Sequence, residues 1–359
     1  MKKEERLLRV GVLGCGPISQ AAHLDACVKS RNVELYAVCD QAKDLAAQMA
    51  ARFEARRCYT EYDAMLADPE VEAIVIATAD QFHVEAAIRA LETGKDVLVE
   101  KPSGITVREC ERLAARGRQL NRVVQVGTMK RFDPGIRAAR RFLDEEGGEI
   151  LALKAWYCDS IYRYIETDNL QPVPITSSLV RRPAGNPKAN RPVYYLLGHG
   201  SHLFDTALFL GGPIRAVRAT RTEKFGSLCW MVSAEFEGGF TGHLDLTIPV
   251  RMDWHEGFQI YAEGGGVVGR TYNPWYFRAS EVNCFSAKDG VTRRVIGADA
   301  HFYKLQLEGF GDTVLHGAPQ LGATAEDGAH VLRALTAVAK ACRTGEPIAL
   351  ADVTEETIE

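Results

Sequence analysis

The chain has 359 residues, 46% of them hydrophobic and 25% charged, and a formal net charge of −4. A chain of this length accommodates two domains, each with a core of its own. Because the charge is near balance and no basic stripe or tail is present, nucleic acid is excluded as an expected partner.

The N-terminal residues and the cysteines bear on where the protein acts. The positively charged start runs directly into a short apolar stretch from Leu7, which leaves no room for a signal-peptide cleavage site. The nine cysteines are odd in number and contain no C-x-x-C pair. They fit reduced thiols better than a disulfide framework or a zinc site. We expect a cytoplasmic protein that needs no metal and no membrane.

Residues 8–23, LRVGVLGCGPISQAAH, are expected to form a strand, a tight turn and the start of a helix. The letters GCGPIS fill the G-x-G-x-x-G/A spacing, with Ser in the last place. Gly14 permits the turn, and Gly16 lets the backbone approach a pyrophosphate. Pro17 and Ile18 open a helix whose unpaired N–H groups attract the anion. The pattern predicts a dinucleotide site, although a strand-to-helix turn without a ligand has the same pattern.

A second apolar strand over 33–38 leads to Asp40. An acidic residue at this place binds the ribose hydroxyls of NAD. Gln41 and Ala42 follow, and neither offers the cation that a 2′-phosphate needs, so NAD is favoured over NADP. Capping of a helix over 43–52 is an alternative role for Asp40, and one carboxylate can serve both.

Helical and strand-like segments then alternate as far as residue 127. Alternation of this kind implies a doubly wound parallel sheet with right-handed crossovers, here of six strands. Ligands of such sheets bind beyond the carboxyl ends of the strands. We therefore expect a nucleotide-binding domain over 1–128. Its strand ends bring to the cofactor Thr78, Ala79, His83, Glu100 and Lys101.

Beyond residue 128 the pattern changes. Strands separated by turns fill 214–296, and Gly264–Gly266 reads as a hairpin turn because no helix follows it. Helices are expected over 302–316 and 325–344, the second capped by Thr324 and stopped by Gly345. These features predict an α/β domain over 129–359 with a large open, mostly antiparallel sheet.

The Pro-rich stretch 158–192 is expected to be irregular and has two interpretations. Its aromatic faces and hydrogen-bond donors suit a sugar ring or an aromatic group, as loops of this length are often binding loops. A subunit-packing arm is the other interpretation. The side chains in question are Tyr162, Arg163, Tyr164, Arg181, Arg182 and Asn190.

Two further residues are candidates for chemistry. Lys101 precedes a proline at a strand end, and His202 lies in the segment GHGSHLFD. Taken singly, the lysine also fits a solvated cation and the histidine a core residue bonded to a carbonyl.

The combination of GCGPIS, Asp40, ATADQFHVEAA, EKP, VGTMKRFDP and GSHLFD resembles the Gfo/Idh/MocA family of oxidoreductases over nearly the whole chain. The resemblance implies a Rossmann domain, bound NAD, and a second domain whose sheet forms an active-site wall and often the subunit interface. It implies oxidation of a secondary hydroxyl of a sugar, cyclitol or sugar conjugate, or the reverse reduction. Lys101 matches the family's catalytic lysine, and His202 matches its catalytic or substrate-orienting histidine. Arg131, in VGTMKRFDP, is either a cofactor contact or a packing residue.

These roles agree with elementary chemistry. A lysine whose pKa is lowered by burial and by a nicotinamide cation accepts the hydroxyl proton near neutral pH. His202 holds that hydroxyl or relays its proton. Asp205, on the same helical face, either orients His202 or makes an ordinary structural hydrogen bond. Metal ligation by His199, His202 and Asp205 is disfavoured because no second cluster supports it.

One position departs from the family pattern. Many members have Asp four residues before the histidine, where this chain has Gly198. Either His199, Asp159 or Asp168 compensates, or the pocket opens to a bulkier group.

We expect oxidation of a glycoside with a large aglycone, at carbon 3, by a homodimer or homotetramer. The alternatives are an inositol or aldose dehydrogenase, an NAD-dependent glycosidase acting through a 3-keto intermediate, and a non-catalytic NAD-sensing regulator.

Overall fold

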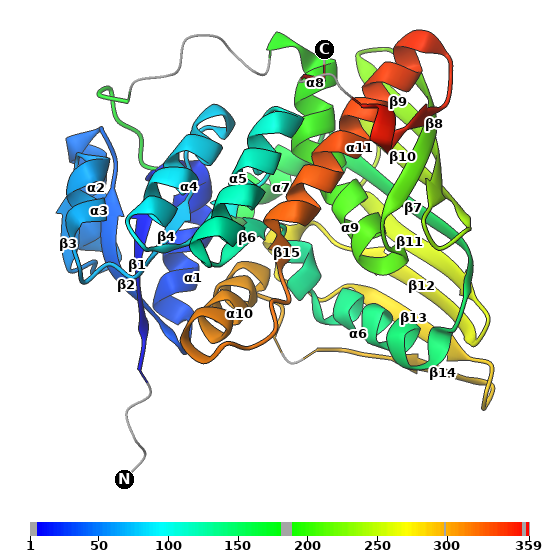
Figure 1. Cartoon of the computed structure of the whole chain (residues 1–359), viewed down its shortest axis with the longest axis horizontal. Coiled ribbons are helices and arrows are strands. Elements are labelled where there is room, and N and C mark those ends of the chain that lie inside the picture. Colours follow the sequence, from blue (N-terminus) through cyan, green and yellow to red (C-terminus); the bar gives the residue numbers. More distant parts are fainter. Residues whose placement is uncertain (1–5, 181–188, 298, 354–356, 359) are drawn as a thin grey trace. The chain divides into compact units, whose positions relative to one another are not determined.

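The computed structural model describes residues 6–180, 189–297, 299–353 and 357–358 (Figure 1). It contains two compact units. The first comprises 1–129, 171–186 and 301–329, and the second comprises 130–170, 187–300 and 330–359. The expected domain boundary after residue 128 stays a prediction. The two units are defined by how closely their residues pack, which does not say that either folds by itself.

The first unit is built on a seven-stranded sheet with the order β15-β6-β5-β4-β1-β2-β3. Strands β1 to β6 are parallel, and β15 pairs antiparallel with β6. The predicted doubly wound parallel sheet is thereby confirmed. The strands are β1 (Leu8–Leu13), β2 (Val33–Cys39), β3 (Arg57–Tyr59), β4 (Ala73–Ile76), β5 (Asp96–Glu100), β6 (Val124–Gly127) and β15 (Ala323–Thr324).

Helices cover this sheet on both faces, so its central strands are largely apolar. All residues of β4 and β5 are buried, and Ile74, Ile76, Val97 and Val99 pack in one core cluster with side chains of α4 and α5. The helices of this unit are α1 (Leu24–Lys29), α2 (Lys43–Arg52), α3 (Tyr62–Ala67), α4 (His83–Glu92), α5 (Val107–Leu120) and α10 (Phe302–His316). Helix α1 packs against α10.

The second unit holds a nine-stranded sheet with the order β14-β13-β12-β11-β7-β10-β9-β8-β16. Strands β7 and β10 are parallel, and the other neighbouring strands described are antiparallel. This confirms the open, mostly antiparallel sheet. The strands are β7 (Ile150–Ser160), β8 (Ile214–Lys224), β9 (Ser227–Phe236), β10 (Thr241–Val250), β11 (His255–Ala262), β12 (Gly265–Thr271), β13 (Glu281–Ser286), β14 (Val291–Arg294) and β16 (Ile348–Ala349).

The helices associated with this unit include one that the sequence did not predict. Residues 158–192 were expected to be irregular, but β7 runs on to Ser160 and 163–170 form helix α7. This segment contains no Pro or Gly, since the prolines begin at Pro172. Arg181 and Arg182 lie outside the described residues. The helices are α6 (Pro134–Phe142), α7 (Arg163–Leu170), α8 (Arg191–Tyr195), α9 (Ser201–Gly211) and α11 (Ala325–Thr344).

Helices α8 and α9 are joined by a π-helical turn over 196–200, so residues 191–211 form one run of helical turns. Helix α9 packs on β7 and β10. No helix in the described ranges combines the length and the hydropathy that a membrane span requires.

Candidate active site

The glycine turn after β1 separates two kinds of glycine. Gly14 has φ +93°, and a Cβ there would lie 2.7 Å from the carbonyl oxygen of Ala77, so the fold itself requires glycine. At Gly16 a Cβ would meet nothing within 4 Å. The protein's own packing therefore does not require this glycine, and the open space beside it is what the close approach of a pyrophosphate to the backbone would need. The chain turns helical at Pro17 and Ile18, as expected.

Asp40 joins this turn to the start of α2. Its Oδ2 accepts the N–H of Cys15 at 2.8 Å, and its Oδ1 accepts the N–H of Ala42 at 2.8 Å. The residue does not cap α2 as predicted in the alternative, because the N-cap is Ala42, without a side-chain bond. Each carboxylate oxygen keeps a further lone pair for a ribose hydroxyl. The turn, its open approach at Gly16 and this acid fit an NAD molecule.

Glu100, at the end of β5, is turned into the protein. Its carboxylate accepts a hydrogen bond from Nε2 of His23 at 2.9 Å and from the N–H of Lys101 at 3.0 Å. Burial raises the pKa of Glu100, but the His23 bond and the charges of His23, Lys101 and His83 outweigh it, so the pKa lies below its usual value. Glu100 therefore ties the helical turn behind the glycines to the lysine.

Sequence reasoning placed Glu100 at the cofactor and missed its partners. His23 also meets the ring of Tyr303 edge-on, with centroids 5.7 Å apart. Gly127 leaves room for the carboxylate, because a Cβ there would lie 3.1 Å from Glu100 Oε1. The only sequence signal for these partners was the presence of a histidine, His23, within the nucleotide motif. Lys101 itself is half-buried.

His83 is buried and joins two strand ends. Its Nδ1 lies 2.7 Å from the carbonyl oxygen of Pro102, and its Nε2 lies 3.1 Å from that of Thr78. The ring therefore shapes the loops after β4 and β5. Thr78 is half-buried and Ala79 is exposed, so these two residues are accessible at the strand end.

Arg131 and Asp205 both belong to the second unit, where they form a buried ion pair. Arg131 Nη2 lies 2.8 Å from Oδ1 of Asp205, and its Nε lies 3.0 and 3.1 Å from the two carboxylate oxygens. The two side chains are 7% and 3% exposed. Bidentate pairing of this kind fixes both groups. The carboxylate suggested as an orienter of His202 thus engages Arg131.

Tyr157 of β7 is the centre of an aromatic cluster that contains His202. Its ring stacks on His202, with centroids 6.0 Å apart and planes 4° apart, and meets His199 and Trp254 edge-on. Nζ of Lys130 lies 4.5 Å from the centroid of the Tyr157 ring. Lys130 also forms a buried ion pair with Glu256. His199 and His202 are therefore brought together in one cluster.

Asp159 follows Tyr157 on the same strand and contacts this cluster. Its Oδ2 lies 2.5 Å from Nη1 of Arg163 and 3.5 Å from Nδ1 of His199. Burial raises the pKa of Asp159 to about 6, although the charge of Arg163, a hydrogen bond from the backbone of Ser160 and the charge of Lys130 oppose the change.

The remaining residues proposed for the substrate lie nearby in sequence. Tyr162 is exposed, and Arg163 begins α7; the side chain of Tyr164 is outside the described set. At Gly198 a Cβ would meet only Tyr194, at 3.9 Å, so the position is open as the sequence suggested.

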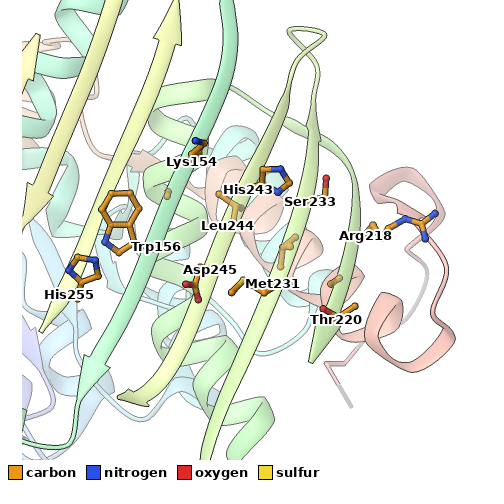
Figure 2. Close-up of a pocket in the computed structure, with 13 residues that line it drawn as sticks. Lys154, Trp156, Arg218, Thr220, Met231, Ser233, His243, Leu244, Asp245 and His255 are labelled. Carbon is orange, nitrogen blue, oxygen red and sulfur yellow. The ribbon is translucent and has the colours of Figure 1, made fainter. Parts of the chain in front are cut away.

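A hollow of about 570 Å³ lies on the opposite face of the second sheet (Figure 2). Successive side chains of a strand point to opposite faces, so Trp156 lines this hollow whereas Tyr157 belongs to the cluster. Trp156 stacks on His255 with centroids 5.5 Å apart, and Asp245 and Met231 face the same space. None of the predicted catalytic or cofactor residues lines it.

The fold and the glycine turn define a Rossmann-type nucleotide-binding domain joined to a second, sheet-containing unit. Residues 8–128 match the model of the oxidoreductase family with an NAD-binding Rossmann fold, Gfo/Idh/MocA. This match covers about a third of the chain, and NAD is the cofactor that the family's Rossmann fold binds.

Curated relatives include two inositol 2-dehydrogenases of Saccharopolyspora erythraea. One, inositol 2-dehydrogenase 2, is 37% identical over 139 residues, 38% of this chain and 41% of that protein. The chain thus spans well under two thirds of the first relatives it matches, an oxidoreductase of Rhizobium meliloti among them, at 38%. The other, inositol 2-dehydrogenase 3, is 27% identical over 357 residues, 96% of each chain.

Solved structures share the fold over the whole chain. Levoglucosan dehydrogenase in complex with NADH has a TM-score of 0.77 at 20% identity, covering 96% of this chain and 99% of that one. An NAD binding oxidoreductase from Klebsiella pneumoniae has a TM-score of 0.79 at 18% identity, with the same coverage. At these identities the likeness shows the fold.

Proposed function

We propose that this protein is an NAD-dependent dehydrogenase that oxidises a secondary hydroxyl of a sugar or glycoside, or reduces the corresponding ketone. The observation that carries the proposal is the fixed position of Lys101. Its backbone N–H is held by the buried carboxylate of Glu100, which also binds the helical turn after the glycines. The names of the relatives, inositol and levoglucosan dehydrogenases, support a cyclic polyol as substrate.

NAD, when bound, accepts the hydride from the carbinol carbon. The amine of Lys101 takes the hydroxyl proton as the hydride leaves, and it returns the proton in the reducing direction. His202, which is stacked on Tyr157, holds the hydroxyl or relays its proton to solvent. Gly14, Gly16 and Asp40 hold the cofactor.

For the substrate we propose a glycoside with a bulky aglycone, oxidised at carbon 3. The open position at Gly198 and the exposed ring of Tyr162 support a large group. An inositol dehydrogenase is the second candidate, favoured by the relative that matches along 96% of this chain.

The test uses Lys101→Met, with Lys288→Met as its control, since Lys288 lies in an exposed turn. NADH formation is followed by absorbance with myo-inositol, d-glucose, levoglucosan and an aryl β-glucoside. Lys101→Met is expected to lower kcat by about 10²- to 10⁴-fold, the range of general base catalysis. The dissociation constant of NAD, measured by calorimetry, stays unchanged. Turnover by Lys101→Met at the control's rate would refute the role of the lysine, and NAD binding with no turnover on the panel would favour a regulator.

We also propose a cytoplasmic enzyme that assembles as a homodimer or homotetramer through the exposed face of the second sheet. All nine cysteines are free thiols, which supports a reducing compartment. Exposed apolar side chains on that face support the assembly; they are Met231, Tyr261, Val268 and Phe285.

A further inference from the structure

The carboxylate of Asp159 has one oxygen, Oδ1, for which the described residues provide no hydrogen-bond donor within bonding geometry. Its Oδ2 contacts Arg163 at 2.5 Å and His199 at 3.5 Å, whereas Oδ1 is buried and accepts no hydrogen bond from any described residue. The Asp159 side chain is 5% exposed. A buried acceptor without a donor costs free energy, which a bound donor recovers. Oδ1 of Asp159 is therefore a candidate acceptor for a hydrogen bond from a bound molecule.

The charges around Asp159 define the chemistry of that donor. Arg163 faces it from α7, Lys130 from the turn after β6, and His199 from the π-helical turn before α9. Lys130 is paired with Glu256, as Arg163 is with Asp159, so the cluster matches two cations with two carboxylates. No excess positive charge is left for a phosphate or a carboxylate of a ligand. A neutral O–H group is the donor that this arrangement suits.

The other two groups that the sequence offered in place of the missing carboxylate fit less well. Asp168 is exposed on α7. His199 carries no negative charge, and its Nδ1 already lies 3.3 Å from the hydroxyl of Tyr157. At Gly198 there is space rather than a carboxylate. Asp159 is the carboxylate that contacts the histidine segment from β7.

We propose that Asp159 binds a hydroxyl of the substrate through Oδ1 and so supplies, from a different strand, the carboxylate that position 198 lacks. This inference rests on the proposed oxidation of a polyol. It makes the substrate a neutral polyhydroxyl compound, and it makes Asp159 a substrate-binding residue that selects for one ring hydroxyl.

The test is a double-mutant cycle in which one change is Asp159→Asn and the other is the removal of one hydroxyl from the substrate. Asp168→Asn is the matched control, since it removes a carboxylate from the neighbouring helix. The substrate is the panel sugar with the highest kcat/KM, together with its monodeoxy analogues. We expect Asp159→Asn to lower kcat/KM by about ten- to a hundredfold, the effect of a charge-assisted hydrogen bond. The change falls mainly on KM, while Asp168→Asn and NAD affinity stay at wild-type values.

For one monodeoxy analogue, the kcat/KM of the wild type is expected to be lower than with the parent sugar by about the same factor. For Asp159→Asn, the kcat/KM with that analogue should be little lower than with the parent sugar. If every analogue costs the variant and the wild type equally, Asp159 only supports the structure and the inference is overturned. If the wild type and Asp168→Asn oxidise the sugar and Asp159→Asn has the same kcat/KM, this inference alone fails. If neither reduces NAD with any polyol, the proposed function fails first and this inference falls with it.

Discussion

Asp159 illustrates how a single buried carboxylate links pH to both stability and activity. Because burial raises its pKa to about 6, the folded protein holds this proton more tightly than the unfolded chain does. Between the ordinary value near 4 and about 6, the unfolded chain has therefore released the proton while the folded protein still binds it. The contribution of Asp159 to the free energy of unfolding falls as pH rises through this window.

This gives a prediction for Asp159→Asn, whose amide does not titrate. The free energy of unfolding of the wild type, minus that of the variant, should fall by up to about 3 kcal/mol between about pH 4 and 6.5 and then level off. Urea denaturation followed by circular dichroism measures it. Asp168→Asn should show no such window, and a difference that grows with pH would contradict the assignment.

The same ionisation should appear in catalysis. If Oδ1 of Asp159 binds a hydroxyl in its charged form, kcat/KM of the wild type falls below about pH 6. In Asp159→Asn, the acidic limb at that pH should disappear, which initial rates from about pH 5 to 9 would reveal. An unchanged acidic limb in the variant would assign it to another group.

Local spacing was enough to predict the tight turn at Gly14, where the structure requires a glycine, whereas the role of Lys101 stays a prediction. The sequence could not predict which side chains pair with one another, because the pairs join distant positions: His23 with Glu100, and Arg131 with Asp205. No periodicity in one chain pairs a histidine with a carboxylate from another strand. Asp159 was named only as one of three alternatives for the same reason.

The turn after β1 offers a matched pair of substitutions. Gly14→Ala places a Cβ against the carbonyl of Ala77 in a left-handed conformation, and should destabilise the protein by about 1 to 3 kcal/mol. Gly16→Ala meets no protein atom, so its Tm should stay near the wild type while NAD affinity falls by about tenfold or more. Thermal denaturation and calorimetric titration with NAD distinguish the two. Wild-type NAD affinity in Gly16→Ala would contradict a pyrophosphate at this turn.

Elements with clear end signals were predicted to the residue. Helix α11 spans 325–344, with Thr324 accepting the N–H of Asp327 and Gly345 at φ +76° after its last turn. Strand β3 was not located, because its residues Arg57 and Cys58 are exposed and form no apolar run. Helix α7 was not predicted, because the prolines that follow it made the whole of 158–192 look irregular.

At the scale of the whole molecule, the exposed face of the second sheet is where we propose a subunit contact. Met231 and Val268 are 55% and 49% exposed on this face. Clusters of exposed apolar side chains on a sheet are typical of interfaces. A lysine at either position opposes the burial of that part of the face against an identical face.

We expect the double variant Met231→Lys, Val268→Lys to sediment as a monomer under conditions in which the wild type is a dimer or tetramer. Val28→Lys, on the exposed side of α1, is the control because Val28 is 58% exposed in the first unit. Analytical ultracentrifugation measures the masses. A wild-type mass for the double variant would place the contact elsewhere.

The bond between His23 and Glu100 has a consequence for protein engineering. An exchange of residues 8–23 for the glycine-rich segment of another enzyme is one way to alter cofactor preference. Here such a graft would also remove the histidine whose Nε2 lies 2.9 Å from the carboxylate of Glu100, a residue that is 6% exposed. The orphaned acid would take up a proton or draw in water, and the lysine beside it would lose its anchor. A successful exchange in this scaffold must therefore transplant the two residues as one unit.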